Sequence, residues 1–427
     1  MKLFSDRKNG FPLTTKAFFY GWVIVAACVI IQIMQLGIQY SFGVFFKPLI
    51  ADFGWSRAAT SGAYSLSMIC GGLSAIPLGL LADRFGPAKV SVVCGFIMGL
   101  GLVLASQVRE LWQLYLTIGL LLGTSLGGTL AITGGVTIRW FFKKRGMALG
   151  IVAAGNGLGT VFIPLLVARL INTFGWSQTY IITGIAAGII TIGSGLLLRR
   201  DPAAMGLKPY GTIITPLQAS TGIPGSTRPA PAQGVNLRAA VRTRPFWLIG
   251  FVYFFLGICI HVTMVHLVNY ATDLGIAALT AATLFSIIGI GGIIGRLVMG
   301  SVSDRIGSFN ALIIACIVLA ASLIWLIFSR ELWMLYIFAV LFGFSYGGEV
   351  PLMPMLISRF FGLQAVMALT GAITGIARAG GALSSWLGGK IFDVSQSYLI
   401  AFILMAIIAV LTLTTALGLK KVKFKER

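Results

Sequence analysis

Apolar runs of about 20 residues, separated by short polar segments, recur along the whole chain. A run of that length, wound as an α-helix, crosses the hydrocarbon core of a lipid bilayer. The first run begins too late and extends too far to be a cleaved signal peptide, so we expect nothing to be removed. The pattern predicts twelve membrane-spanning helices, near residues 18 to 42, 57 to 81, 89 to 107, 112 to 138, 146 to 170, 177 to 198, 245 to 270, 278 to 301, 309 to 328, 332 to 357, 365 to 388 and 397 to 418.

The composition agrees with a chain that lies mostly within a membrane. Of its 427 residues, 57% are hydrophobic and only 10% are charged, whereas soluble domains carry about 25% charged residues. The predicted fold class is therefore an all-α membrane protein that crosses the bilayer many times.

The net charge of +21 has two explanations, a nucleic-acid partner or an orientation signal for membrane insertion. With twelve helices, both termini lie on one side of the membrane. If that side is the cytoplasm, 24 of the 32 Lys and Arg residues are cytoplasmic, 6 are outside and 2 lie within helices. The positive-inside rule accounts for the charge. We expect a multi-pass protein of the cell inner (plasma) membrane with cytoplasmic termini and no nucleic-acid partner.

The five cysteines all fall inside apolar runs. Their number is odd and no two of them have CxxC spacing. Such cysteines serve as small packing residues. We therefore expect no disulfide, no metal site and no cofactor.

Sequence motifs recur at an offset of 220 or 221 residues. The pattern Gly-x-x-x-Asp-Arg-x-Gly occurs at 79–86 and at 300–307, and the run at 123–129 returns at 343–349. The chain is thus a duplication of a six-helix unit. We expect two six-helix bundles, at 1–198 and 245–427, joined by a flexible cytoplasmic linker at 199–244 that is rich in Pro, Gly, Ser and Thr.

Four charged residues of the repeated pattern are shared by the two halves. They are Asp83 and Arg84 in the first copy and Asp304 and Arg305 in the second. Because both copies keep them, we assign them to conformational loops of the common fold.

Three other charges, inside the predicted helices, are not shared. A residue needed only for packing of the common fold tends to recur in both halves, so these three are functional candidates. All lie near the bilayer midplane, where transporters built from repeats hold their substrates. The first half has Ala75 where the second has Arg296, Thr129 where it has Glu349, and Leu158 where it has Arg378.

Two buried arginines against one buried acid favour an anionic substrate. A guanidinium can bind both oxygens of a carboxylate in a bidentate pair. Glycines at 289, 292 and 300 share a helix face with Arg296 and leave room beside it. The alternatives are a structural salt bridge between Arg296 and Glu349, and a structural role for Arg378.

Glu349 is the candidate proton carrier. A buried carboxyl near arginines can change its protonation as a cavity opens, closes or loads. Alternatively, a neutral Glu349 donates to backbone carbonyls freed by Pro351 and Pro354. Tyr346, three residues earlier, would place a hydroxyl beside the same site.

The seventh predicted helix holds further candidates for proton transfer. Asp273 lies near its outer end and matches Asp52 of the first half, which favours a turn or capping role, with an outer gate as the alternative. His261 and His266 are five residues apart and face different sides. We expect neutral histidines bonded to neighbouring helices, with His266 the better candidate for a proton relay.

The first predicted helix has one polar face. Gln32, Gln35 and Gln39 follow one another at spacings of three and four. They either form hydrogen bonds between helices or line a cavity. In the second case Gln35, Gln39 and the adjacent Tyr40 are candidates for substrate contact.

The repeated loop, the two sets of six helices and the long linker resemble the major facilitator superfamily over essentially the whole chain. The segments 20–27, 41–46, 53–56, 141–150 and 266–275 look like those of the monocarboxylate transporter family and its bacterial relatives. The resemblance implies a proton-coupled carrier of small monocarboxylates such as lactate or pyruvate that works by alternating access. It also implies that Arg296, in Gly295-Arg296-Leu-Val-Met-Gly300, binds the carboxylate.

The sequence departs from that family at three positions. Its vertebrate members have an aspartate where this chain has Gly292, a lysine at the position of Tyr40, and an acidic residue where this chain has Tyr20. The proton must therefore bind elsewhere, which favours Glu349 and Asp273.

Arg378 supports an alternative. Relatives that resemble oxalate and formate exchangers hold a dianion with one basic residue in helix eight and another in helix eleven, and this chain has both. We expect monocarboxylate symport, with oxalate/formate-type exchange as the alternative. The expected partners are a small organic anion, a proton and the lipid bilayer, and we expect the protein to act as a monomer.

Other classes of protein fit less well. No nucleophile–base pair, metal cluster or cofactor motif indicates an enzyme. A cation or drug exporter would have more buried acids than buried bases. A receptor of the same fold would not need a midplane proton site.

Overall fold

The computed structural model describes residues 19–212, 234–395 and 398–421, apart from some side chains within the helices. Over these residues the chain is helical, with short turns and two isolated bridges. The helices are α1 (Gly21–Phe53), α2 (Arg57–Phe85), α3 (Pro87–Ala105), α4 (Leu111–Leu114), the π-helical η1 (Tyr115–Leu122), α5 (Gly123–Leu126), α6 (Thr129–Trp140), α7 (Arg145–Leu197), the 3-10 helix η2 (Pro202–Met205), α8 (Leu237–Val241), α9 (Arg244–Asp273), α10 (Ala278–Ile306), α11 (Ser308–Phe328), α12 (Leu332–Glu349), α13 (Leu352–Phe361), α14 (Val366–Ser395) and α15 (Leu399–Lys421).

Eleven stretches of the described chain are long and apolar enough to cross a membrane. One of them, α7, has 53 residues and contains Gly175 in a non-helical conformation, with φ 79° and ψ 168°. A helix of that length would measure about 80 Å, far more than one crossing needs. α7 therefore combines the fifth and sixth predicted helices, and the prediction of twelve crossings is confirmed.

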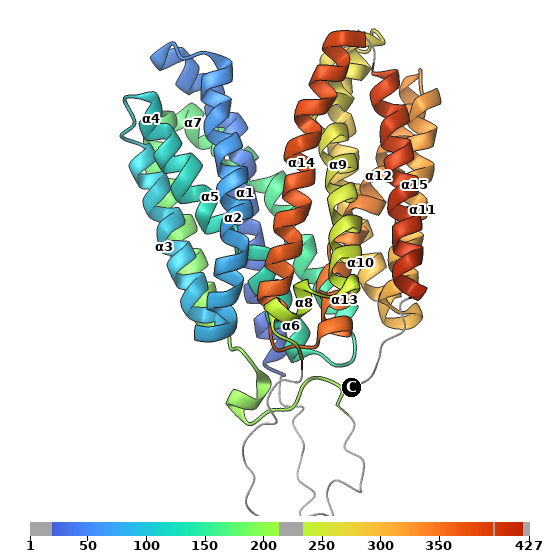
Figure 1. Ribbon diagram of the computed structural model, residues 1–427. Helices are drawn as coiled ribbons and strands as arrows, with labels where there is room; N and C mark the ends of the chain where they lie inside the picture. Colours follow the sequence, from blue (N-terminus) through green and yellow to red (C-terminus); the bar gives the residue numbers. More distant parts are fainter. Residues whose placement is uncertain (1–18, 213–233, 396–397, 422–427) are drawn as a thin grey trace, which may run out of the picture.

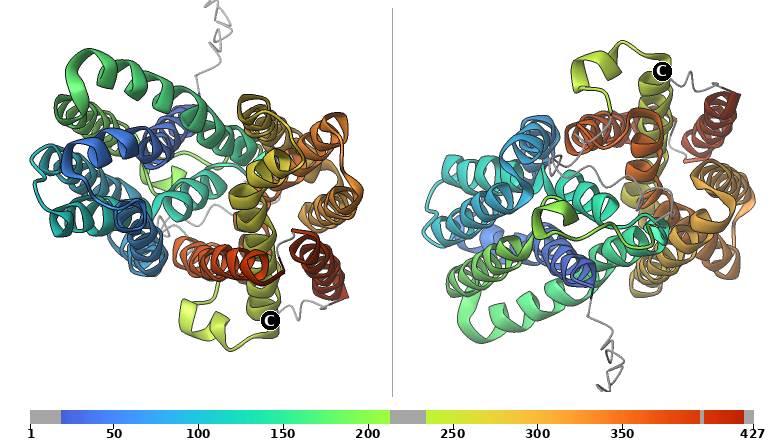
Figure 2. Two further views of the ribbon diagram at one scale, coloured as in Figure 1. Left: turned by 90° about the horizontal axis from the view of Figure 1, so that it is seen from above. Right: turned by 90° about the horizontal axis from the view of Figure 1, so that it is seen from below.

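The helices form two groups (Figure 1). We call α1–α7 the N-terminal half and α9–α15 the C-terminal half. The halves meet at the end of the molecule that carries residues 199–212 and 234–244, which we call the linker end, and their ribbons diverge towards the other end (Figures 1 and 2). Two helix pairs, α7 with α10 and α2 with α14, form the main contact between the halves.

Glycines end equivalent helices in the two halves. α1 stops at Gly54 and α9 stops before Gly275, with φ of 64° and 83°. α2 and α10 end at Gly86 and Gly307, with φ of 95° and 84°. Positive φ is open to glycine at little energetic cost. α1 continues to Phe53, well past the predicted end near 42.

The fourth and tenth crossings are both interrupted, at nearby positions of the repeat. In the N-terminal half, Gly127 and Gly128 separate α5 from α6. In the C-terminal half, α12 ends at Glu349, and Val350 and Pro351 precede α13. Proline cannot donate the helical hydrogen bond, and such a break is tolerated in a membrane where the protein covers the freed backbone groups.

The two described ends of the linker pair with different halves. Tyr210 donates its backbone N–H to the carbonyl of Trp140 at 2.9 Å, and its own carbonyl accepts from the N–H of Phe142 at 3.0 Å. Val235 donates to the carbonyl of Phe361 at 3.0 Å. Trp140 and Phe361 are the last residues of α6 and α13, which are equivalent helices of the two halves.

Candidate functional site

The two membrane arginines lie where the halves meet. Arg296 is on α10, and a methyl group placed on Gly157 of α7 would be only 3.2 Å from its Nη1. Arg378 is on α14, and a methyl group on Gly72 of α2 would lie 3.7 Å from its Cδ. Each arginine of the C-terminal half therefore rests against a glycine of the N-terminal half.

Tyrosines surround the two guanidinium groups. The guanidinium carbon of Arg296 lies 5.3 Å from the ring centroid of Tyr346, within the range of a cation–π interaction. Electrostatic interactions join Tyr40 of α1 to both arginines, to Tyr346 and to Tyr64 of α2. Tyr40 is 48% exposed although it is beside these groups, so it borders accessible space between the halves.

No acid balances these arginines within the described residues. The ion pairs found there involve neither Arg296 nor Arg378. Arg296 is only 3% exposed, and its Nε, like Nη1 of Arg378, has no hydrogen-bond partner. Burying an uncompensated cation is costly, and an anion bound between the arginines would relieve the cost. The site is built for a negative charge.

Glu349 lies away from the arginines, in the interior of the C-terminal half. It is 2% exposed, and its Oε1 lies 3.1 Å from Oγ of Ser345 on the same helix. Its backbone carbonyl accepts a hydrogen bond from the hydroxyl of Tyr253 on α9 at 3.0 Å. In the described part of the chain it forms neither an ion pair with Arg296 nor a side-chain hydrogen bond to a backbone carbonyl.

The hydrogen bonds around Ser345 depend on the protonation of Glu349. Oγ of Ser345 is also 2.8 Å from the carbonyl oxygen of Ala315 on α11. A hydroxyl carries one hydrogen, so it can donate to only one of these two oxygens. Both contacts are satisfied when a protonated Glu349 donates to Ser345 and Ser345 donates to Ala315.

The three glutamines of α1 are buried. Nε2 of Gln32 donates to Oγ1 of Thr133 on α6 at 3.0 Å, and Nε2 of Gln39 lies 3.1 Å from Sδ of Met68 on α2. Both contacts join neighbouring helices, as the first interpretation of this face predicts. Gln35 is 2% exposed, and its Oε1 has no partner.

The candidates of the seventh helix are separated along α9. Asp273 is the last residue of α9 and is exposed at the end opposite the linker. Nδ1 of His261 lies 2.9 Å from the carbonyl of Gly257 in its own helix, and His261 interacts electrostatically with Arg378. His266 lies within α9, and its side chain is outside the described part of the chain.

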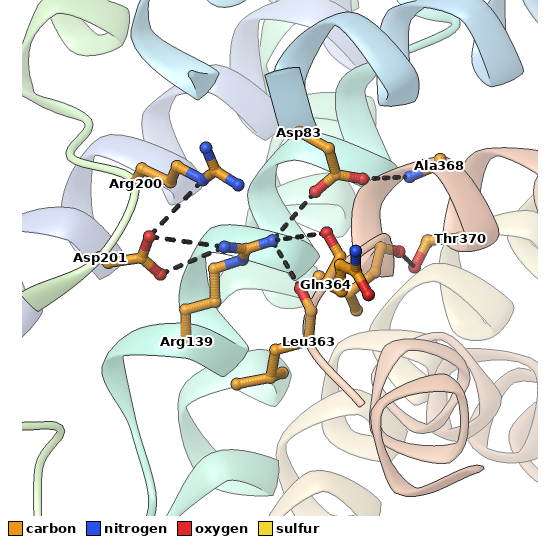
Figure 3. Close-up of polar contacts among 9 residues, drawn as sticks. Asp83, Arg139, Arg200, Asp201, Leu363, Gln364, Ala368 and Thr370 are labelled. Carbon is orange, nitrogen blue, oxygen red and sulfur yellow. Dashed lines mark hydrogen bonds and ion pairs between the residues drawn. The ribbon is translucent and has the colours of Figure 1, made fainter. Parts of the chain in front are cut away.

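The shared aspartates connect the halves at the linker end. Asp83 accepts a hydrogen bond from the backbone N–H of Ala368, in the first turn of α14, at 2.9 Å (Figure 3). Asp304 accepts from the N–H groups of Gly146 and Met147, in the first turn of α7, at 2.7 and 2.9 Å. Each aspartate thus binds the positive end of a helix in the opposite half.

Arg139 strengthens one side of this arrangement. Arg139 is 2% exposed and forms ion pairs with Asp83 at 3.0 Å and with Asp201 at 3.2 Å (Figure 3). It also donates a hydrogen bond of 2.6 Å to the carbonyl of Leu363 in the other half. Its duplicate, Arg359, is exposed and lies 4.7 Å from the ring centroid of Phe309. The linker end is therefore not symmetric.

The arginines of the repeated pattern make no comparable contact. Arg84 is exposed and lies over the ring of Phe85 at 5.1 Å, and Arg305 is exposed. Of the four residues assigned to conformational loops, the two aspartates join the halves in the described structure.

Sequence reasoning missed Tyr64, Arg139 and Asp201. Tyr64 could have been found, because it shares a helix face with Met68 and Ala75 at helical spacing. Arg139 and Arg359 occupy matching positions of the two halves, so a comparison of the halves gives no signal for Arg139.

A duplicated bundle with twelve crossings, and with unpaired cations between its halves, has the architecture of a secondary transporter. The family model for the Major Facilitator Superfamily matches residues 28–331, and the model for sugar (and other) transporters matches residues 243–420. The chain belongs to the major facilitator superfamily. It is a transporter and not an enzyme, and the predicted all-α fold of two six-helix bundles is confirmed.

Curated relatives agree with this assignment. The chain is 28% identical over 392 residues to monocarboxylate transporter 13 of Rattus norvegicus, covering 90% of this chain and 85% of the relative. It is 27% identical over 397 residues to monocarboxylate transporter 11 of Homo sapiens, covering 90% and 80%. It is 24% identical over 349 residues to YhjX, an uncharacterized MFS-type transporter of Escherichia coli (strain K12), covering 80% and 81%.

A solved structure has the same fold. The proton:xylose symporter XylE bound to 6-bromo-6-deoxy-D-glucose matches with a TM-score of 0.74, covering 93% of this chain and 95% of that chain. At 13% identity the likeness concerns the fold alone.

Proposed function

We propose that this transporter carries a small monocarboxylate of the lactate or pyruvate type, together with a proton, by alternating access. The observation that carries the proposal is the unpaired guanidinium of Arg296, buried between the halves beside the ring of Tyr346. A carboxylate supplies the two acceptor oxygens that a guanidinium prefers. The names of the relatives support the same class of substrate.

In this proposal the substrate enters from the end opposite the linker. Its carboxylate binds Arg296 and its short carbon chain contacts Tyr346 and Tyr40, with Gln35 and Gln39 on the same helix as Tyr40. Binding neutralises the arginine and so lowers the cost of closing the halves around it. The contacts of Asp83 and Asp304 then break at the linker end, and the substrate leaves on that side.

Glu349 is the proposed proton site. Its contact with Ser345, and the contact of Ser345 with Ala315, are both satisfied only in the protonated form. When Glu349 loses its proton, Ser345 can no longer satisfy both Glu349 and the carbonyl of Ala315, so the contact between α11 and α12 changes. Proton release therefore accompanies a rearrangement inside the C-terminal half. Asp273 and His266 remain proposed sites through which the proton enters.

We further propose that residues 1–198 and 245–427 move as two bundles joined by the linker at 199–244. The linker and both termini lie on the cytoplasmic side of the inner (plasma) membrane, in agreement with the distribution of Lys and Arg. One copy of the chain contains the whole site, so the monomer is the transporting unit.

Purified protein in liposomes tests the function directly. An inward proton gradient should drive accumulation of labelled lactate above its external concentration, and a protonophore should abolish the accumulation. Lactate uptake equal to that of empty liposomes under the same gradient contradicts the proposal.

A second candidate function is exchange of small organic anions of the oxalate and formate type. The observation that favours it is Arg378, a second unpaired cation beside Tyr40 and Tyr64. Two cations suit a substrate with two carboxylates. Uptake that ignores the proton gradient but requires oxalate or formate inside the liposomes would establish exchange instead of symport.

A further inference from the structure

α2 and α14 approach closely along the contact between the halves. A methyl group on Gly375 of α14 would lie 3.2 Å from the carbonyl oxygen of Gly72, and one on Gly371 would overlap the carbonyl of Ala75. Such close approach is possible because these positions lack side chains. Arg378 follows Gly375 by about one turn on the same helix.

Gly71 on α2 provides the space for the guanidinium of Arg378. A methyl group on Gly71 would overlap Nη1 of Arg378, whereas one on the neighbouring Gly72 would make only ordinary contacts, 3.7 Å from Cβ and Cδ of the same arginine. Nη1 has no hydrogen-bond partner that would hold it in place. The absence of a side chain at Gly71 thus decides where this charge lies.

We propose that Gly71 is a specificity-determining position, which lets Arg378 extend across the contact and offer a second cation to the substrate. The proposal rests on the proposed function, since it assumes that Arg296 binds the first carboxylate. With Arg378 in place, the site also accepts a small dicarboxylate. With Arg378 displaced by a side chain at position 71, it binds monocarboxylates alone.

The decisive experiment measures the binding of lactate and oxalate to purified full-length protein by calorimetry. Gly71→Ala is compared with Gly72→Ala, the matched control on the same helix. Gly71→Ala should weaken oxalate binding at least about tenfold, since a hydrogen bond to a charged group contributes about 1.5–3 kcal/mol. Lactate binding should change less than about threefold, and Gly72→Ala should leave both affinities near those of the parent.

A double-mutant comparison separates displacement of Arg378 from helix packing. A methyl group on Gly71 would also lie 3.1 Å from the carbonyl of Gly123, so the variant disturbs the N-terminal half somewhat. If Gly71 acts through Arg378, then Gly71→Ala has no further effect on oxalate binding in the Arg378→Gln background. Additive losses in the double variant overturn the proposal, as does an equal loss of lactate and oxalate binding.

The wild-type protein distinguishes this inference from the proposed function. Binding of lactate without binding of oxalate overturns the role of Gly71 and leaves monocarboxylate transport intact. Binding of neither anion contradicts the proposed function itself.

Discussion

The carboxylate of Asp304 accepts a hydrogen bond of 2.7 Å from the backbone N–H of Gly146, across the contact between the two halves. The duplicate aspartate, Asp83 of the N-terminal half, accepts the corresponding hydrogen bond from the backbone N–H of Ala368 in the C-terminal half. One repeated pattern thus supplies two helix caps that hold the linker end closed.

Asp304→Ala should shift the protein towards the arrangement with an open linker end. Loss of a helix cap costs about 1–2 kcal/mol, so the ratio of open to closed protein should rise about five- to thirtyfold. A cysteine introduced at Met367, which packs against Gly135 between the halves, should then react faster with a polar maleimide. Asp304→Asn, which keeps an acceptor, should have a smaller effect. Exposed Lys89→Ala, on α3, is the control, and equal rates in all variants would argue against a cap.

Arg296→Gln should weaken the binding of lactate about 30-fold or more. Truncating one partner of a buried charge pair costs about 2–5 kcal/mol, and no other described arginine takes the place beside Tyr346. Arg296→Lys keeps the charge but loses the planar pair of N–H donors that can bind both oxygens of a carboxylate. It should give an intermediate affinity. Calorimetry on purified protein measures lactate binding to the wild-type chain, to Arg296→Gln and to Arg296→Lys. Exposed Lys89→Gln is the control. Unchanged affinity in Arg296→Gln would remove the central claim of the proposed function.

Glu349→Gln should separate transport from the proton gradient. Glutamine keeps a group that can donate to Ser345 but cannot release a proton. Exchange of labelled lactate against internal lactate should continue, while accumulation driven by a proton gradient should be lost. Ser345→Ala keeps the carboxyl but removes the hydroxyl that links it to Ala315, so gradient-driven accumulation should be weakened and not abolished. Full accumulation by Glu349→Gln would assign this residue a structural role.

Gly347→Ala should destabilise the C-terminal half. A methyl group there would lie 2.6 Å from Cα of Gly292, with backbone on both sides of the contact. Overpacking of this kind costs about 1–3 kcal/mol. Gly193→Ala is the matched control, because a methyl group at this helical position meets nothing within 4 Å. The melting temperature in detergent should fall for Gly347→Ala and stay constant or rise slightly for Gly193→Ala.

Apolar run length and the internal repeat predict most of this fold. Helix ends at Gly54 and Gly86 follow from local chemistry, since glycine allows the positive φ that ends a helix. The join of two crossings in α7 at Gly175 is different. A glycine within an apolar run does not reveal how sharply the chain turns there.

The site was predicted in part, and the reason lies in helix rotation. Counting residues from a helix end gives the depth of Arg296 and Glu349 in the bilayer, but it does not give the direction in which each side chain points. Packing sets that direction, and it turns Arg296 towards α7 and Glu349 towards Ser345. Charges at equal depth therefore lie in different surroundings.

The two ends of the linker bind different halves, since Tyr210 pairs with the end of α6 at Trp140 and Val235 pairs with the end of α13 at Phe361. A break in the covalent chain between Thr212 and Gly234 would leave both pairings intact. The protein could therefore be produced as two separate polypeptides that reassemble in the membrane through the contacts between their helices.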